Sequence, residues 1–253
     1  MDSSISMRKM RRRQATILAC GFLLLFVAAA RSDGQSVEVT LHVDFESSAP
    51  TRKEPVALPV SVVWLTPVAA NAAAAPPLPA HIFQMAQRNK MFDPHILIVP
   101  VGSIVVFPNR DPFFHNVFSL FNGKKFDLGL YETGSERSVR FDREGISYVF
   151  CNIHPQMGAV ILSLATPYYA VSREGAIIIP QVPPGRYHLN VWSESATLES
   201  LNAARRDVTV QMTATNLGSV SLVAAPSPLA HHANKFGESY RESPDSASPE
   251  IVY

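Results

Sequence analysis

The chain has 253 residues, a formal net charge of +1 and a hydrophobic content of 47%. This length is enough for one large domain or two small ones, each with a core of its own. The balanced charge produces no strong basic or acidic field, so the composition argues against binding to nucleic acid or another charged polymer.

The N-terminus has the three parts of an export signal. A basic stretch at residues 8–13 precedes an apolar run at residues 15–30, which ends in three alanines suited to cleavage. The run has about 16 residues, whereas a membrane span needs about 20. We therefore expect residues 1–30 to be removed, leaving a periplasmic or secreted protein without a membrane span. An uncleaved N-terminal anchor is the alternative.

After the signal, the sequence predicts short strands almost throughout, because β-branched apolar segments alternate with Gly, Pro, Asn or Asp. Two strands are expected within residues 36–66, and residues 67–80 form an Ala/Pro-rich linker. About seven strands follow between residues 81 and 166, a number that suits a sandwich of two sheets. These segments are 81–87, 96–101, 103–109, 115–121, 138–142, 146–152 and 159–165.

A further block of strands is expected within residues 167–224, with one candidate helix at residues 195–204. Residues 225–253 are rich in Ser, Pro and Glu and lack periodicity, so we predict a disordered tail. The predicted fold class is therefore all-β, with two β-sandwiches.

The expected export decides how the two cysteines are interpreted. Cys20 falls in the signal, so the mature chain keeps only Cys151. A single cysteine in an oxidising compartment forms no internal disulfide. Cys151 is thus a buried apolar residue, a reactive liability or a ligand.

Cys151 opens a Cys-x2-His-x2-Met segment that continues with His154 and Met157. Cys151 lies at the end of one predicted strand. A tight loop before the next strand can bring the side chains of Cys151, His154 and Met157 to one ion. Thiolate and thioether are soft ligands, and two histidines, a cysteine and a weak axial methionine form the blue-copper set. Zinc normally takes four strong ligands, and thioether is not among them. His115, which begins a distant strand, is the candidate second histidine.

A longer set of segments resembles a cupredoxin of the plastocyanin and amicyanin type, as in plastocyanin-like proteins of methylamine utilisation. The resemblance covers residues 81–166 and implies a Greek-key β-sandwich. The matching segments are 92–94, 101–103, 106–109, 111, 115–119 and 151–157.

This resemblance implies one type 1 copper site with His115, Cys151, His154 and Met157 as the ligands. It also implies that Asn116 braces the Cys151 loop and hydrogen-bonds the thiolate. His154 would reach the surface as the electron port, where a redox partner protein docks. The loop departs from the family at residues 152, 153 and 156, which leaves the identity of the partner open.

Residues 173–179 and 182–192 resemble a transthyretin-like sandwich of carboxypeptidase regulatory domains. Two strands normally precede this stretch in such a module, and residues 36–66 can supply them. We therefore expect residues 36–66 and 167–224 to form one discontinuous, smaller sandwich into which the cupredoxin is inserted. In the alternative, residues 36–66 are additional strands of the cupredoxin.

The expected function is one-electron transfer between periplasmic partners. Copper capture or delivery by the same ligands is an alternative, and so is a surface binding module in which the copper site is secondary. We expect no enzyme, because four protein ligands leave no open position for a substrate. The chain also has no His-x-His pair, nucleophile elbow or phosphate loop.

Overall fold

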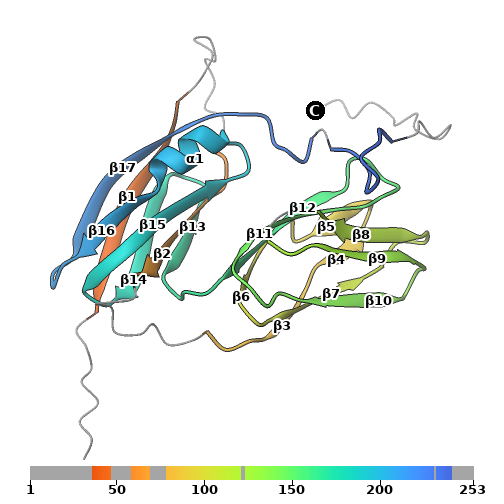
Figure 1. Ribbon diagram of the computed structural model, residues 1–253, viewed down its shortest axis with the longest axis horizontal. Helices are drawn as coiled ribbons and strands as arrows, with labels where there is room; N and C mark the ends of the chain where they lie inside the picture. Colours follow the sequence, from red (N-terminus) through yellow and green to blue (C-terminus); the bar gives the residue numbers. More distant parts are fainter. Residues whose placement is uncertain (1–35, 47–57, 69–77, 121–122, 231, 241–253) are drawn as a thin grey trace, which may run out of the picture. The chain divides into compact units, whose positions relative to one another are not determined.

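The computed structural model is built almost entirely of strands (Figure 1). It describes residues 36–46, 58–68, 78–120, 123–230 and 232–240, which all belong to one compact unit, Gly34–Tyr253. The predicted signal at 1–30 and most of the predicted linker lie outside the described residues. Among the described residues, no helix has the length and apolar character to cross a membrane.

The strands from residue 82 to 164 form a sandwich. One sheet has the order β6-β12-β11-β8-β9, and the facing sheet has the order β10-β7-β3. A short hairpin, β4-β5, lies beside them. The bounds are β3 (Ile82–Gln84), β4 (Ala86–Arg88), β5 (Met91–Asp93), β6 (Ile96–Pro100), β7 (Ile104–Pro108), β8 (His115–Ser119), β9 (Phe126–Tyr131), β10 (Glu136–Arg140), β11 (Gly145–Phe150) and β12 (Gly158–Leu164).

Strand β12 is buried on both faces, which explains its nearly continuous apolar sequence. Because side chains alternate across a strand, Ala159 and Ile161 enter the core between the two sheets of this sandwich. Val160 and Leu162 enter a second apolar cluster on the opposite face. The five-stranded sheet therefore separates two cores, and Cys151 lies in the first of them.

The remaining strands form a second sandwich, with sheets β14-β1-β17 and β13-β2-β15-β16. Its bounds are β1 (Val37–Glu46), β2 (Ser61–Pro67), β13 (Tyr169–Ser172), β14 (Ala176–Val182), β15 (Gly185–Ser193), α1 (Leu198–Ala204), β16 (Arg206–Val210) and β17 (Thr215–Val223). Among the described residues, β1 and β2 pair only with strands beyond residue 168. The predicted insertion of the first sandwich into the second requires this pairing. The domain boundaries and the transthyretin-like character of this sandwich stay predictions.

Local sequence explains where the elements differ from expectation. Helix α1 is shorter than the candidate at residues 195–204, because the hydroxyl of Thr197 accepts the Ser200 N–H and fixes the N-cap there. Strand β5 has only three residues, and β9 contains Gly129 and Asp127, which are both unfavourable in strands. Pairing of β5 with β4 and of β9 with β8 supplies the order that the local pattern lacks.

The segment after β17 differs from the predicted tail. Residues 225–230 and 232–240 are described, and Leu229 belongs to the second apolar cluster with only 7% of its surface exposed. Residues 241–253 lie outside the described residues. Isolated anchors such as Leu229 leave no periodic pattern, so the composition could not predict that this segment would dock.

Candidate metal centre

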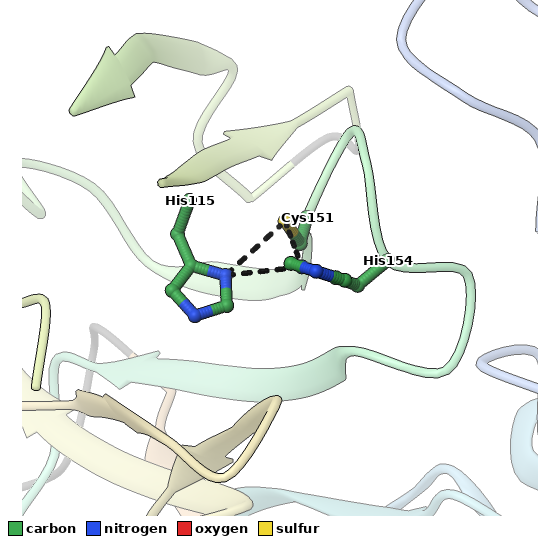
Figure 2. Close-up of side chains that lie close together, drawn as sticks. All are labelled: His115, Cys151 and His154. Carbon is green, nitrogen blue, oxygen red and sulfur yellow. Dashed lines mark hydrogen bonds between the residues drawn. The ribbon is translucent and has the colours of Figure 1, made fainter. Parts of the chain in front are cut away.

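Neighbouring strands bring three of the four predicted ligands together, namely His115, Cys151 and His154 (Figure 2). His115 is the first residue of β8, and Cys151 directly follows β11. These strands are antiparallel partners through Phe118 and Phe150, which places His115 near the Cys151 end of β11. His154 lies in the loop at residues 151–157 between β11 and β12, so it returns over the same point.

Three donor atoms form a nearly equilateral triangle. The Nδ1 atoms of His115 and His154 are 3.1 Å apart. The Sγ of Cys151 lies 3.7 Å from Nδ1 of His115 and 3.5 Å from Nδ1 of His154. A point equidistant from three atoms at these separations is about 2 Å from each, which matches a metal–nitrogen bond of about 2.0–2.1 Å and is close to a metal–sulfur bond of about 2.3 Å. The residues present therefore fit a metal ion.

A buried carboxylate orients His115. Its Nε2 lies 2.8 Å from Oδ2 of Asp111, and both side chains are almost completely buried. The carboxylate is an acceptor, so Nε2 carries the proton and Nδ1 turns a lone pair toward the triangle. Metal-bound histidines commonly donate their second N–H to a carboxylate in this way.

Asp111 is itself held by the turn between β4 and β5. The main-chain N–H groups of Asn89 and Lys90 donate to its two oxygens at 2.6 and 2.9 Å. Burial works to raise the pKa of Asp111, but the hydrogen bonds from Lys90, His115 and Asn89 outweigh it and hold this pKa below its ordinary value. Asp111 is therefore a fixed negative charge behind His115.

An Asp111→Asn substitution should weaken metal binding about 10- to 100-fold, the usual effect of losing an outer partner of a ligand. The amide removes the negative charge that stabilises the imidazole facing the metal. Competition titration with a copper chelator measures the change. Asp142→Asn is the matched control, because Asp142 pairs with Lys124 on the surface at 2.8 Å. Equal affinities in the two variants would contradict this role for Asp111.

The sulfur of Cys151 is fully buried and surrounded by donors. Burial raises the pKa of the Cys151 thiol, whereas main-chain N–H groups of Asn116, Ile153 and His154 hydrogen-bond to the sulfur and act to lower it. Those three donors favour a negative charge on the sulfur, and a bound cation would favour the thiolate further. In the metal-free protein burial outweighs these donors and holds the pKa of the Cys151 thiol above its ordinary value, so the anionic ligand form requires the bound cation.

Met157 closes the loop. Its side chain is completely buried in the same apolar cluster as Cys151. The N–H of Cys151 donates to the carbonyl of Met157 at 3.2 Å, and the N–H of Met157 donates to the carbonyl of His154 at 3.0 Å. These two bonds fold the loop so that it carries three of the four predicted ligands on one tight turn.

The main chain and the side chain of Asn116 have different partners. Its main-chain N–H bonds to the sulfur of Cys151, but its side-chain Nδ2 donates to Oδ1 of Asp127 on β9 at 2.8 Å. Among the described residues, the buried Oδ1 of Asn116 has no hydrogen-bond partner. The side chain therefore ties β8 to β9.

His154 is the outer histidine, since it is partly exposed whereas His115 is fully buried. The ring of Phe113 lies beside both imidazoles, with centroids 5.2 Å from His115 and 5.5 Å from His154. Lys90 places its ammonium 5.6 Å from the centre of that ring. No role for Asp111, Phe113 or Lys90 was predicted from the sequence. A carboxylate four residues before His115 was the available signal for Asp111.

The metal-free protein should lose stability as the pH falls from about 6.5 to about 4. Burial, followed by the charges of His115 and Lys90, lowers the pKa of His154 to about 4. Burial also lowers the pKa of His115. An unfolded histidine has a pKa of about 6.5, so between these values the unfolded chain binds protons that the folded chain does not. Protonation therefore favours unfolding across that window.

Urea unfolding of the metal-free protein at several pH values measures this effect. A His154→Gln variant should show a shallower pH dependence, because one of the two suppressed protonations is removed. Parallel profiles for the wild type and the variant would contradict the assignment.

No protein-family model and no curated protein matches this sequence. Among solved structures, the chain is similar to a copper-containing nitrite reductase from Thermus scotoductus SA-01 (27% identity, TM-score 0.31) and to a purple cupredoxin from Nitrosopumilus maritimus (26%, 0.29). It is also similar to a reduced mutant of amicyanin (19%, 0.31). The matches cover 39%, 34% and 40% of this chain and 25%, 100% and 91% of those chains. This chain thus spans about a quarter of the nitrite reductase chain.

Proposed function

We propose that the protein binds one copper ion in a type 1 site and carries single electrons between redox partners outside the cytoplasm. The ligands are His115, Cys151, His154 and Met157. The triangle of His115 Nδ1, His154 Nδ1 and Cys151 Sγ carries this proposal. Two imidazoles, a thiolate and a thioether are the donor set that copper prefers over zinc.

Copper bound in this set would supply a one-electron couple. The protein's part is to hold the ligands still, and its residues are placed to do so. His115 is fixed by Asp111 within the core, and the sulfur of Cys151 is held by three main-chain N–H groups. A fixed set of four protein ligands also leaves no open position for a substrate, which supports a carrier rather than an enzyme.

The proposed docking surface for the partner surrounds His154, the partly exposed histidine. Two large apolar side chains next to the ligands in sequence are exposed, namely Phe114 at 54% and Ile153 at 40%. Exposed apolar groups of this kind are typical of protein contact sites. Localisation in the periplasm or secretion rests on the predicted signal at residues 1–30.

Repeated redox cycling separates this function from copper capture or delivery. The copper-loaded protein should be reduced and reoxidised several times in the presence of a mild copper chelator, with its visible spectrum and copper content followed together. A carrier recovers the full spectrum in each cycle and keeps its copper. Loss of copper to the chelator in the reduced state would instead support copper handling.

A further inference from the structure

The segment that follows the second sandwich returns to the metal loop. We call residues 227–240 the C-terminal strap; the structure describes all of them except residue 231. The hydroxyl of Ser227 bonds to the carboxylate of Glu194 and also accepts the N–H of Leu229 at 3.0 Å. Leu229 packs so closely on Gly158, the first residue of β12, that a Cβ there would lie 3.1 Å from the leucine side chain.

Two hydrogen bonds join the strap to the first residues of the loop. The hydroxyl of Tyr240 donates to the main-chain oxygen of Cys151 at 2.8 Å. The main-chain N–H of Lys235 donates to Oδ1 of Asn152 at 2.9 Å. The strap therefore makes polar contacts with Cys151, a predicted ligand, and with Asn152, the residue after it.

The same lysine connects the strap to the strand that carries His115. The ammonium of Lys235 lies 2.7 Å from Oδ2 of Asp127, whose other oxygen accepts the Asn116 side chain at 2.8 Å. Asn116 directly follows His115 and donates its main-chain N–H to the sulfur of Cys151. One residue of the strap thus braces both sides of the metal centre.

Aromatic contacts fix the strap against β11. The ring of His232 stacks on Phe150 with centroids 4.1 Å apart and an interplanar angle of 23°. Tyr240 meets His232 edge-on at 5.2 Å, and Nδ1 of His232 donates to the carbonyl of Leu229 at 3.0 Å. Because Phe150 immediately precedes Cys151, the strap packs against the residue on either side of the cysteine.

We propose that the C-terminal strap holds the loop at residues 151–157 in its metal-binding conformation, with Tyr240 and Lys235 as positioning residues. The loop lies outside the strands. The two main-chain hydrogen bonds within it do not involve the carbonyl of Cys151. This carbonyl instead accepts the hydroxyl of Tyr240. Removing an outside brace favours local opening of such a segment. The consequence for copper rests on the proposed function, whereas the consequence for the loop does not.

Tyr240→Phe tests this role by removing a single hydroxyl group. The matched control is Tyr187→Phe, because the hydroxyl of Tyr187 donates to the carbonyl of Pro183 at 2.7 Å in the second sandwich. Amide hydrogen exchange at residues 151–157 of the metal-free protein should be about fivefold faster in Tyr240→Phe, the effect of one typical net hydrogen bond. The control should match the wild type in this loop. Copper release to a chelator should be faster by a similar factor.

Lys235→Met provides a second test, because it removes the contact with Asp127 and leaves the Tyr240 hydroxyl in place. It should also accelerate exchange in the loop. Equal loop protection in the wild type, Tyr240→Phe and Lys235→Met would overturn the inference. A wild type without a blue copper spectrum would overturn the proposed function alone, because the exchange measurement requires no metal.

Discussion

Replacing Cys151 with serine is expected to abolish the intense visible absorption of the copper-loaded protein while the fold is retained. The absorption of a blue site arises from the copper–thiolate bond, and a serine hydroxyl is a hard and weakly acidic donor that cannot replace it. The fold should survive because a buried serine oxygen can accept the main-chain N–H groups that now reach the sulfur. The visible absorption and the circular dichroism of the same sample measure the loss of the copper–thiolate band and the retention of the fold.

Met157→Leu is the matched control for this substitution. It removes a completely buried side chain of the same loop but keeps the thiolate, so the strong absorption should remain with an altered energy. An intense blue spectrum in the Cys151→Ser protein would show that the copper lies elsewhere.

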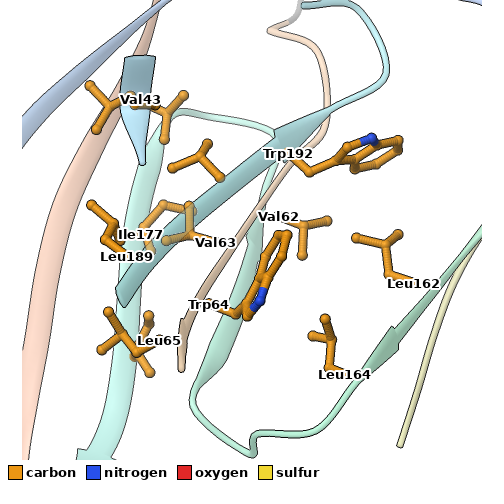
Figure 3. Packing of buried hydrophobic residues seen from close by; sticks show 14 of the residues in the cluster. Val43, Val62, Val63, Trp64, Leu65, Leu162, Leu164, Ile177, Leu189 and Trp192 are labelled. Atoms are coloured by element: carbon orange, nitrogen blue, oxygen red, sulfur yellow. The ribbon is translucent and has the colours of Figure 1, made fainter. Parts of the chain in front are cut away.

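The second large effect concerns stability. Leu162→Ala should lower the free energy of unfolding by about 2–5 kcal/mol, the usual range for a fully buried leucine. Leu162 belongs to β12 of the first sandwich, yet its apolar cluster contains Val62, Trp64 and Trp192 from the second (Figure 3). We therefore expect the loss of packing to lower the stability of both sandwiches.

Two optical probes separate the sandwiches in this experiment. Trp64 and Trp192 are the only tryptophans of the chain, and both lie in the second sandwich, whereas copper absorption reports on the first. In Leu162→Ala, both denaturation curves should move to lower urea concentration. Leu198→Ala is the control, since Leu198 is 76% exposed on α1 and should change stability by less than about 0.5 kcal/mol. An unchanged tryptophan transition in Leu162→Ala would contradict the shared core.

The three proposed loop ligands could be predicted from the sequence because Cys151, His154 and Met157 lie within seven consecutive residues. Their spacing is set by a single turn between two strands, so local chemistry is sufficient. His115 could be named as the candidate second histidine, but its local sequence does not place it at the loop, since the pairing of β8 with β11 does this.

The supports of the site could not be predicted in the same way. Asp111 is held by Asn89, which is 22 residues earlier in the chain, and Cys151 is braced by Tyr240, which is 89 residues later. Such contacts depend on tertiary structure and have no fixed spacing. The same limit applies to the strap, whose polar composition is typical of a disordered tail although single anchors dock it.

In the fold too, some strands are predicted by their own residues and others depend on tertiary contacts. Alternation predicted β1 because one of its faces is buried, and a continuous apolar run predicted β12 because both of its faces are buried. Strands β5 and β9 were missed, since a three-residue strand and a strand with Gly129 have no distinct pattern. Their order comes from neighbouring strands and not from their own residues.

The most direct test of the proposed copper site is an optical and electron paramagnetic resonance spectrum of the purified protein after addition of one equivalent of copper(II). A trigonal site formed by His115, Cys151 and His154 predicts an intense thiolate-to-copper absorption together with a narrow copper hyperfine splitting. A copper-loaded protein with only weak absorption and a wide splitting would place the metal outside these ligands and contradict the proposed type 1 site.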